Sequence, residues 1–175
     1  ALEHSMALSE RLDKLGKAAR RLNESSDQLV VLVRAIDSVL GRLNLEVDYV
    51  DPRPLDETSS TDSHGKRTIE LSLLGYLEID GRYQLALKTV KVHESKVAMS
   101  DSNRGSLTPL LDAPRKILHA AVDHLPALVG ALSQQVSDLV NQVERRCKLA
   151  RDLLADLESL EVMTSGVWPV PDPDG

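Results

Sequence analysis

Residues 8–43, LSERLDKLGKAARRLNESSDQLVVLVRAIDSVLGRL, decide the fold. Apolar side chains recur along this stretch in alternating steps of four and three residues, and Ser26 is the only polar member of the series. A heptad pattern kept up over about five heptads is typical of a coiled coil rather than of a single amphipathic turn. The stretch therefore predicts one long helix over about residues 7–44. Its seam positions are Leu8, Leu12, Leu15, Ala19, Leu22, Ser26, Leu29, Val33, Ile36, Leu40 and Leu43.

A second stretch repeats this pattern and predicts a second long helix over about residues 108–162. Only Arg146 interrupts its seam. Thr108 and Pro109 are a plausible N-cap and first-turn proline, and Pro114 and Pro126 are expected kinks or restarts. The seam consists of Leu118, Val122, Leu125, Val129, Leu132, Val136, Leu139, Val143, Arg146, Ala150, Leu153, Leu157 and Leu160.

The two seams are of similar length, which predicts an α+β, mainly α protein built on an antiparallel coiled-coil hairpin. Leu43 should then lie near Leu125, and Leu8 near Leu160. In that register Ser26 and Arg146 fall within about one helical turn of each other. A polar layer of this kind commonly fixes the register of a coiled coil. The alternative is that Arg146 extends its side chain from the edge of the seam into water.

Apolar residues also spread beyond the two seams, which is more than one helix pair can bury. We expect this surplus to be covered by self-association into a larger bundle or by helices of a partner protein. The alternative is that the segment between the helices, or the tail, covers it. The candidate self-association residues are Leu32, Val39, Leu128, Leu149 and Leu154, and Val31 belongs to the same surplus.

The segment between the helices predicts an antiparallel β-meander with strands over about residues 45–50, 68–79 and 82–93. Asp80-Gly81 between two alternating stretches indicates a two-residue type I′ turn, in which Ile79 opposes Arg82. Residues 51–66 lack an apolar period and are expected to form a flexible loop. The apolar face changes sides around Gly75. A bulge, a strong twist, or a sheet covered on both faces would explain that change.

Composition limits the class of protein. The chain has 175 residues with a formal net charge of -6, which disfavours a general binder of nucleic acid or anionic membranes. No apolar run is long enough to span a bilayer, and no secretory signal is present. A single cysteine, Cys147, cannot form an internal disulfide. We therefore expect a cytoplasmic protein, with residues 1–5 a cloning remnant, 6–163 one domain and 164–175 a Pro-rich flexible tail.

No motif in the sequence predicts catalysis, a cofactor or a metal site. His119 and Asp123 stand four apart with His124 adjacent, but two ligands do not make a metal site. Cys147 has basic neighbours, yet the sequence places no general base beside it. No glycine-rich phosphate loop is present. We expect a protein that is not an enzyme and that binds no cofactor.

Two further features bear on partners. Lys17, Arg20 and Arg21 on the first helix, with Arg145, Lys148 and Arg151 on the second, form a candidate basic patch. Tyr76, Tyr83 and Trp168 are candidate docking residues for a protein partner. The sequence thus favours a non-enzymatic oligomeric coiled-coil scaffold, adaptor or chaperone-like holder. A nucleic-acid-associated accessory protein using the basic patch is the second interpretation. An enzyme with a site at an oligomer interface is the third.

Overall fold

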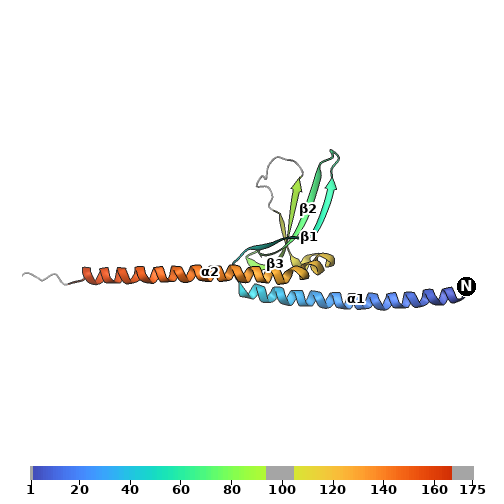
Figure 1. Cartoon of the computed structure of the whole chain (residues 1–175), viewed down its shortest axis with the longest axis horizontal. Coiled ribbons are helices and arrows are strands. Elements are labelled where there is room, and N and C mark those ends of the chain that lie inside the picture. The colour runs from blue at the N-terminus through green and yellow to red at the C-terminus, as the bar shows by residue number, and fades with distance from the viewer. Residues whose placement is uncertain (1, 94–104, 167–175) are drawn as a thin grey trace, which may run out of the picture. The chain divides into compact units, whose positions relative to one another are not determined.

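The computed structural model describes residues 2–93 and 105–166, and it is an α+β fold. Helix α1 (Leu2–Leu43) is followed by strands β1 (Tyr49–Thr61), β2 (Arg67–Ile79), β3 (Arg82–His93) and β4 (Ser106–Pro109), the short 3-10 helix η1 (Leu110–Asp112) and helix α2 (Arg115–Thr164). The chain forms two compact units, residues 1–133 and 134–175. The first contains α1, the sheet and the start of α2 (Figure 1), and the second contains the rest of α2.

The four strands form one antiparallel sheet in the order β1-β2-β3-β4. The predicted hairpin between β2 and β3 is confirmed, with Ile79 opposite Arg82. Asp80 and Gly81 have φ angles of 52° and 78°, the positive values that a type I′ turn requires at both central residues. The short-range Asp-Gly signal therefore predicted both the turn and the register of this strand pair.

Strand β1 is longer than predicted, because it continues to Thr61 where a flexible loop was expected. It lies at the edge of the sheet and its pairing with β2 shifts on either side of Pro54. Prolines are tolerated at edge strands and bulges, where a backbone donor is not needed on the outer side. The turn that follows is closed by a hydrogen bond of 2.9 Å from the amide of Asp62 to the carbonyl oxygen of Lys66.

The change of apolar face at Gly75 does not come from a bulge between β2 and β3, whose register is continuous from Thr68 to Ile79. It reflects burial of both faces of the sheet at this level. Tyr76 and Leu85 oppose each other on one face, and Ala86 opposes Gly75 on the other. The side chains of Tyr76, Leu85 and Ala86 are all buried. Gly75 is needed here because an added Cβ would lie 2.9 Å from the carbonyl oxygen of Tyr49.

The predicted start of the second helix is wrong. Thr108 and Pro109 belong to β4, which pairs with β3 and was not predicted. Helix α2 begins at Arg115, directly after Pro114, whose carbonyl oxygen accepts hydrogen bonds from the amides of Ile117 and Leu118. Pro126 does lie inside α2, and a proline at this position removes one backbone hydrogen bond and favours a kink.

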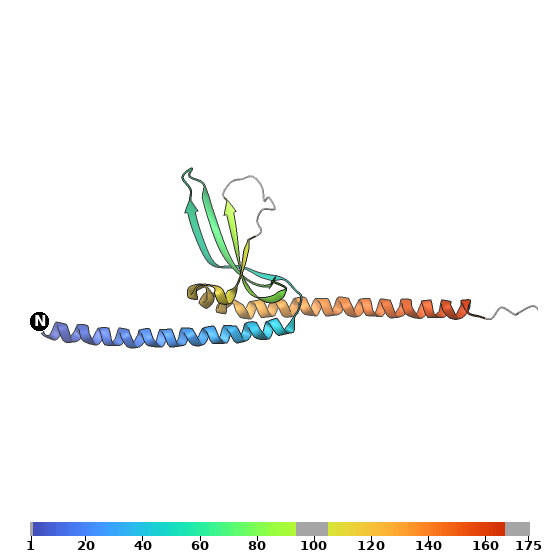
Figure 2. The same cartoon turned by 180° about the vertical axis from the view of Figure 1, so that it is seen from behind.

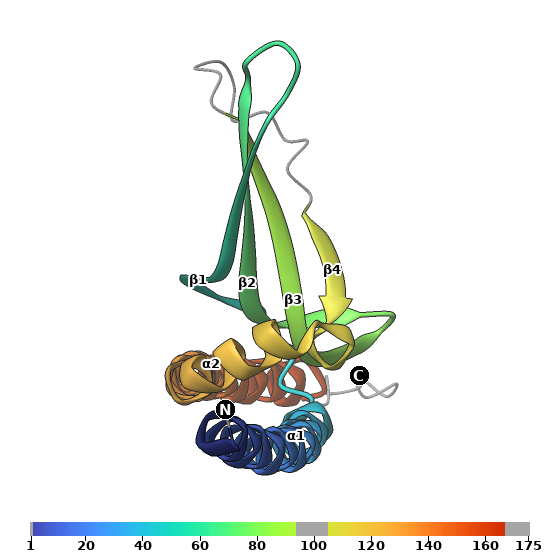
Figure 3. The same cartoon turned by 90° about the vertical axis from the view of Figure 1, so that its right-hand side faces the viewer.

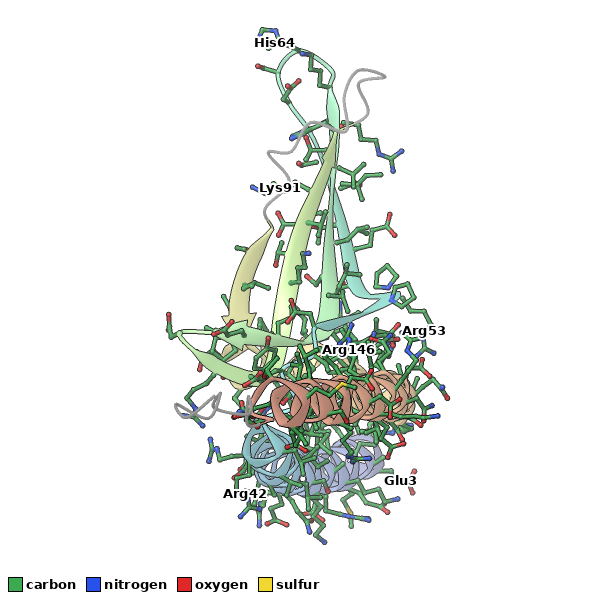
Figure 4. All side chains as sticks on the ribbon, turned by 90° about the vertical axis from the view of Figure 1, so that its left-hand side faces the viewer. Glu3, Arg42, Arg53, His64, Lys91 and Arg146 are labelled. Carbon is green, nitrogen blue, oxygen red and sulfur yellow. The ribbon has the colours of Figure 1, made fainter. Side chains whose placement is uncertain are left out.

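The core of the first unit lies where the base of the sheet meets the helices. Figure 3 shows the gold first turns of α2 running across the lower ends of the strands. Figure 4 shows His64 at the far end of the sheet, away from the helices. The far half of β2 and β3 is only partly buried, so the helices cover the base of the sheet alone. Buried apolar residues are Val33, Leu40, Val47, Leu74, Tyr76, Leu77, Leu85, Ala86, Leu87, Leu110, Leu118, Ala121, Leu125, Leu128 and Leu132.

The antiparallel coiled-coil hairpin is not confirmed. Ser26 of α1 contacts His119 in the first turns of α2, whereas the predicted register needs Ser26 beside Arg146. Within the first unit, the cyan end of α1 and the orange turns of α2 lie side by side and run in the same direction (Figures 1 and 2). The four strands between the helices leave the direction of α2 relative to α1 open. The similar length of the two seams was therefore not enough to predict that direction.

Residues 2–5, expected to be a cloning remnant, continue α1 in the structure. The expected tail falls largely on residues 167–175, which lie outside the described residues. Among residues 2–93 and 105–166, no helix combines the length and apolar character needed to cross a membrane.

Candidate interaction surfaces

The carboxy-terminal half of α1 is fixed to the sheet by two hydrogen bonds. The hydroxyl of Tyr76 donates to the carbonyl oxygen of Leu40 at 3.1 Å. The amide of Leu85 donates to Oδ1 of Asp37 at 2.7 Å. Both partners of each pair lie in or beside the core, where a hydrogen bond is costly to lose. The side of α1 that carries Asp37 and Leu40 therefore packs against the sheet and is not available to bind a partner.

The middle of α1 is fixed to the first turns of α2. Oγ of Ser26 lies 2.7 Å from Nε2 of His119, and Ser26 is buried. On the outside of this contact, Nη2 of Arg115 lies 2.9 Å from Oδ1 of Asp27, and Nη1 of Arg115 lies 3.4 Å from Oδ1 of Asn23. His119, considered in the sequence as a metal ligand, is instead the partner of the one polar residue in the α1 seam.

Strand β1 carries a buried carboxylate close to α2. Asp51 accepts hydrogen bonds from the backbone amide of Arg53 and from its guanidinium, at 2.9 to 3.2 Å. Nδ1 of His124 lies 3.5 Å from Oδ2 of Asp51. The side-chain hydrogen bond from Arg53 holds the pKa of Asp51 below its ordinary value, although burial acts in the opposite direction. Arg53 itself points outward from the strand (Figure 4).

This Asp51 cluster is suited to joining β1 to α2 rather than to chemistry. Nδ1 of His124 is buried without a hydrogen-bond partner, and the carboxylate of Asp51 is its neighbour on β1. Within residues 2–93 and 105–166, no group of three His, Cys, Asp or Glu side chains is placed to hold a metal ion. No local pattern signals this cluster, because Asp51 stands in a stretch that was expected to be a loop.

The amino-terminal half of α1 presents an exposed apolar stripe. Leu8, Leu12, Leu15 and Leu22 are 58 to 65% exposed, and Ala19 completes the series at a seam position. These five residues are called the α1 stripe below. The heptad pattern that predicted a buried seam is therefore present on the helix, but these leucines are exposed in the part of the chain that the structure describes.

The second unit presents a similar surface by itself. Leu139, Val143, Leu153, Leu157 and Leu160 of α2 are 41 to 58% exposed. They lie on one side of the helix at heptad spacing, with Ala150 and Arg146 at the intervening seam positions. These seven residues are called the α2 stripe below. Each unit thus carries, among its described residues, an exposed apolar stripe at heptad spacing.

The candidate self-association residues divide into two groups. Leu32, Val39, Leu149 and Leu154 are exposed, as a contact surface requires. Leu128 is fully buried and belongs to the core. The buried side of the start of α2 is formed by Ala121 and Leu128 rather than by the predicted Val122 and Val129, so the helix is rotated relative to the predicted seam.

The candidate polar layer and basic patch are not assembled within one unit. Ser26, Lys17, Arg20 and Arg21 belong to the first unit, and the second unit contains Arg145, Arg146, Lys148 and Arg151. All of these except Ser26 are exposed. Nζ of Lys17 lies 3.0 Å from Oδ2 of Asp13 one turn away, which offsets part of the positive charge on α1.

The candidate docking residues are not equivalent. Tyr76 is fully buried and its ring stacks on that of Tyr83, with centroids 5.5 Å apart. Tyr76 is therefore a core residue rather than a docking residue. Tyr83 is partly exposed beside the hairpin turn, and burial raises the pKa of its hydroxyl. Trp168 lies outside the described residues.

The contact sites missed in the sequence are single polar residues: Asp37, Asp51 and His119. Each acts across a distance of many residues, and only the folded chain brings the partners together. No family model, curated protein or solved structure matches this chain, so its function has to be inferred from these surfaces.

Proposed function

We propose that this chain is a non-enzymatic, oligomeric coiled-coil protein that acts as a scaffold, adaptor or chaperone-like holder through protein-protein contacts. The observation that supports this proposal is the exposure of heptad-spaced leucines along both the α1 stripe and the α2 stripe. Large exposed apolar surfaces on folded proteins mark sites of association. Regular leucine spacing indicates that the associating element is another helix.

Energetics support the same conclusion. Burying one leucine side chain stabilises a complex by about 1.5 to 3 kcal/mol. Helical stability in proteins comes mainly from packing of an apolar face rather than from intrinsic propensity. No apolar side chain of residues 134–164 is buried in the part of the chain that the structure describes, so an added helical partner would stabilise this part of α2.

Nucleic-acid binding is the less favoured function. The net charge is -6, and carboxylates flank the candidate patch on each helix, at Asp13 and Glu24 on α1 and at Glu144 and Asp152 on α2. Release of counterions from nucleic acid requires a concentrated basic surface. An apolar stripe does not contribute to binding of a phosphate backbone, whereas it can pack against the apolar side of a partner helix.

The test is the oligomeric state together with stripe variants. Light scattering over a range of concentrations should give a mass of at least twice the 19.2 kDa of one chain. Leu12→Gln with Leu157→Gln should lower that mass and reduce helicity measured by circular dichroism. Arg42→Gln with Glu144→Gln is the matched control at exposed positions outside both stripes and should leave both unchanged. A fully helical monomer at all concentrations would refute the proposal.

A further inference from the structure

We infer that the α1 stripe of one chain is covered by the α2 stripe of a second copy, with the two helices antiparallel. This inference rests on the proposed function and names the occupant of its surfaces. Both stripes are exposed among the residues that the structure describes, and an apolar helix face of this kind is stabilised when another helix covers it. Three features of the residues favour a second copy: seam register, side-chain size and charge.

The seam positions of the two stripes align without a gap in one antiparallel register. Leu12 meets Leu160, and Leu15 meets Leu157 in the next layer. Antiparallel coiled coils pair positions of this kind at each layer, where knobs of one helix fill holes of the other. Four consecutive layers result, which is about two heptads of contact on each pairing of helices.

The sizes of the facing residues are complementary in the two remaining layers. Ala19 meets Leu153, and Leu22 meets Ala150. Each alanine of one stripe therefore faces a leucine of the other, so no layer pairs two alanines and these two layers are equal in volume. Beside the seam, Gly16 of α1 lies level with Leu154 of α2 to within one turn, and nothing in the chain lies within 4 Å of an added Cβ at Gly16. Pairing of small with large residues is what a close-packed interface needs.

The charges of residues 11–20 and 152–161 are opposite, whereas Arg21 and Arg151, level with each other beside the last layer, are both basic. Residues 11–20 carry Arg11, Lys14, Lys17 and Arg20 with one acidic residue, Asp13. The facing residues 152–161 carry four carboxylates and no basic residue: Asp152, Asp156, Glu158 and Glu161. Exposed ion pairs add little affinity one by one, but complementary blocks select the partner and suppress pairing of like with like. Pairing of α1 with α1 would oppose two basic blocks.

The contact ends at Leu22, one layer before Ser26. The next layer would be Ser26 with Arg146, and Ser26 is already buried against His119 of its own chain. A parallel arrangement that also matches alanine with leucine aligns Leu12 with Ala150, and it places Arg146 beside Leu8. The antiparallel arrangement avoids that burial of a charged side chain against a leucine.

Disulfide cross-linking between two differently tagged copies tests the pairing. Both copies carry Cys147→Ser, which removes the exposed native thiol. A chain with Leu15→Cys is mixed with a chain with Leu157→Cys and oxidised with glutathione. The expected product is a disulfide between the two tagged chains, formed several times faster than with Leu153→Cys, the partner of Leu15 in the parallel register.

The outcomes separate this inference from the proposed function when light scattering is recorded on the same samples. An oligomer without the Leu15→Cys to Leu157→Cys product, or with faster reaction of Leu153→Cys, overturns the pairing but leaves the proposed function standing. A disulfide between two Leu15→Cys chains as the dominant product also overturns it. A monomer overturns both.

Charge reversal gives a second, independent readout. Lys14→Glu with Arg20→Glu should weaken self-association by about tenfold, and Asp152→Lys with Glu158→Lys should do the same. Unchanged affinity in either double variant, with its helicity intact, overturns the pairing.

Discussion

Oγ of Ser26 lies 2.7 Å from Nε2 of His119, and this contact joins two helices whose residues stand 93 positions apart. Ser26 is the single polar residue in the α1 seam. Its burial is acceptable because the imidazole supplies the hydrogen bond that water would otherwise provide. The contact also marks the boundary on α1 between the part that packs in its own chain and the part that remains exposed.

Replacing Ser26 should reveal the value of this contact. Ser26→Ala removes the hydroxyl and leaves His119 without its hydrogen-bond partner, so the free energy of unfolding should fall by about 1 to 3 kcal/mol. Urea denaturation measures it. Ser25→Ala is the matched control, since Ser25 is exposed one residue earlier, and it should change stability by less than about 0.5 kcal/mol. Equal effects of the two variants would contradict this role for Ser26.

The contact between Asp37 and the amide of Leu85 should depend on an acceptor rather than on charge. Asp37→Ala leaves a part-buried backbone amide unpaired and should destabilise the first unit by about 1 to 3 kcal/mol. Asp37→Asn keeps an oxygen acceptor at the same place and should recover most of that loss. Thermal unfolding followed by circular dichroism compares the three proteins. A deficit in Asp37→Asn as large as that in Asp37→Ala would show that the carboxylate charge matters instead.

Acid should weaken the fold partly through Asp51. Its pKa is lowered in the folded chain, chiefly by the side-chain hydrogen bond from Arg53. Because a lowered pKa favours the folded state when the group is ionised, this stabilisation is fully present above the ordinary value of 3.8 and is lost as the pH falls through the lower folded value. Asp51→Asn should therefore flatten the loss of stability between neutral and acidic pH.

Urea denaturation at a series of pH values provides that comparison. Glu57→Gln, at an exposed position of the same strand, is the control and should keep the pH dependence of the parent. If Asp51→Asn loses stability in acid as steeply as the parent does, the Asp51 cluster does not contribute to the acid response.

Two glycines should respond to alanine with opposite signs. An added Cβ at Gly75 would lie 2.9 Å from the backbone oxygen of Tyr49, so Gly75→Ala should force β1 from β2 and destabilise the sheet by more than about 1 kcal/mol. Nothing lies within 4 Å of an added Cβ at Gly130 inside α2, so Gly130→Ala should stabilise the helix by about 0.5 to 1 kcal/mol. Melting temperatures of the two variants should move in opposite directions; a shared direction would disprove this account of Gly75.

The sequence by itself determined the features that depend on neighbours along the chain. Asp80-Gly81 predicted the β2-β3 hairpin with its register, because positive φ at two successive residues permits few other structures. Heptad spacing predicted two long helices, since periodicity places apolar residues on one side of a helix whatever lies opposite. The end of β1 and the presence of β4 were missed, because short or edge strands with polar residues depend on pairing rather than on pattern.

Only the tertiary structure decided what each apolar or polar position contacts. Periodicity defines which side of a helix is apolar but not what packs against that side. Side chains at the same heptad spacing are therefore buried at Val33 and Leu40 and exposed at Leu12 and Leu15. The partners of Ser26 and Asp37 are His119 and Leu85. Both contacts depend on how α1 and the start of α2 pack against the sheet. That packing results from many interactions between residues far apart in the sequence, and no local pattern contains them.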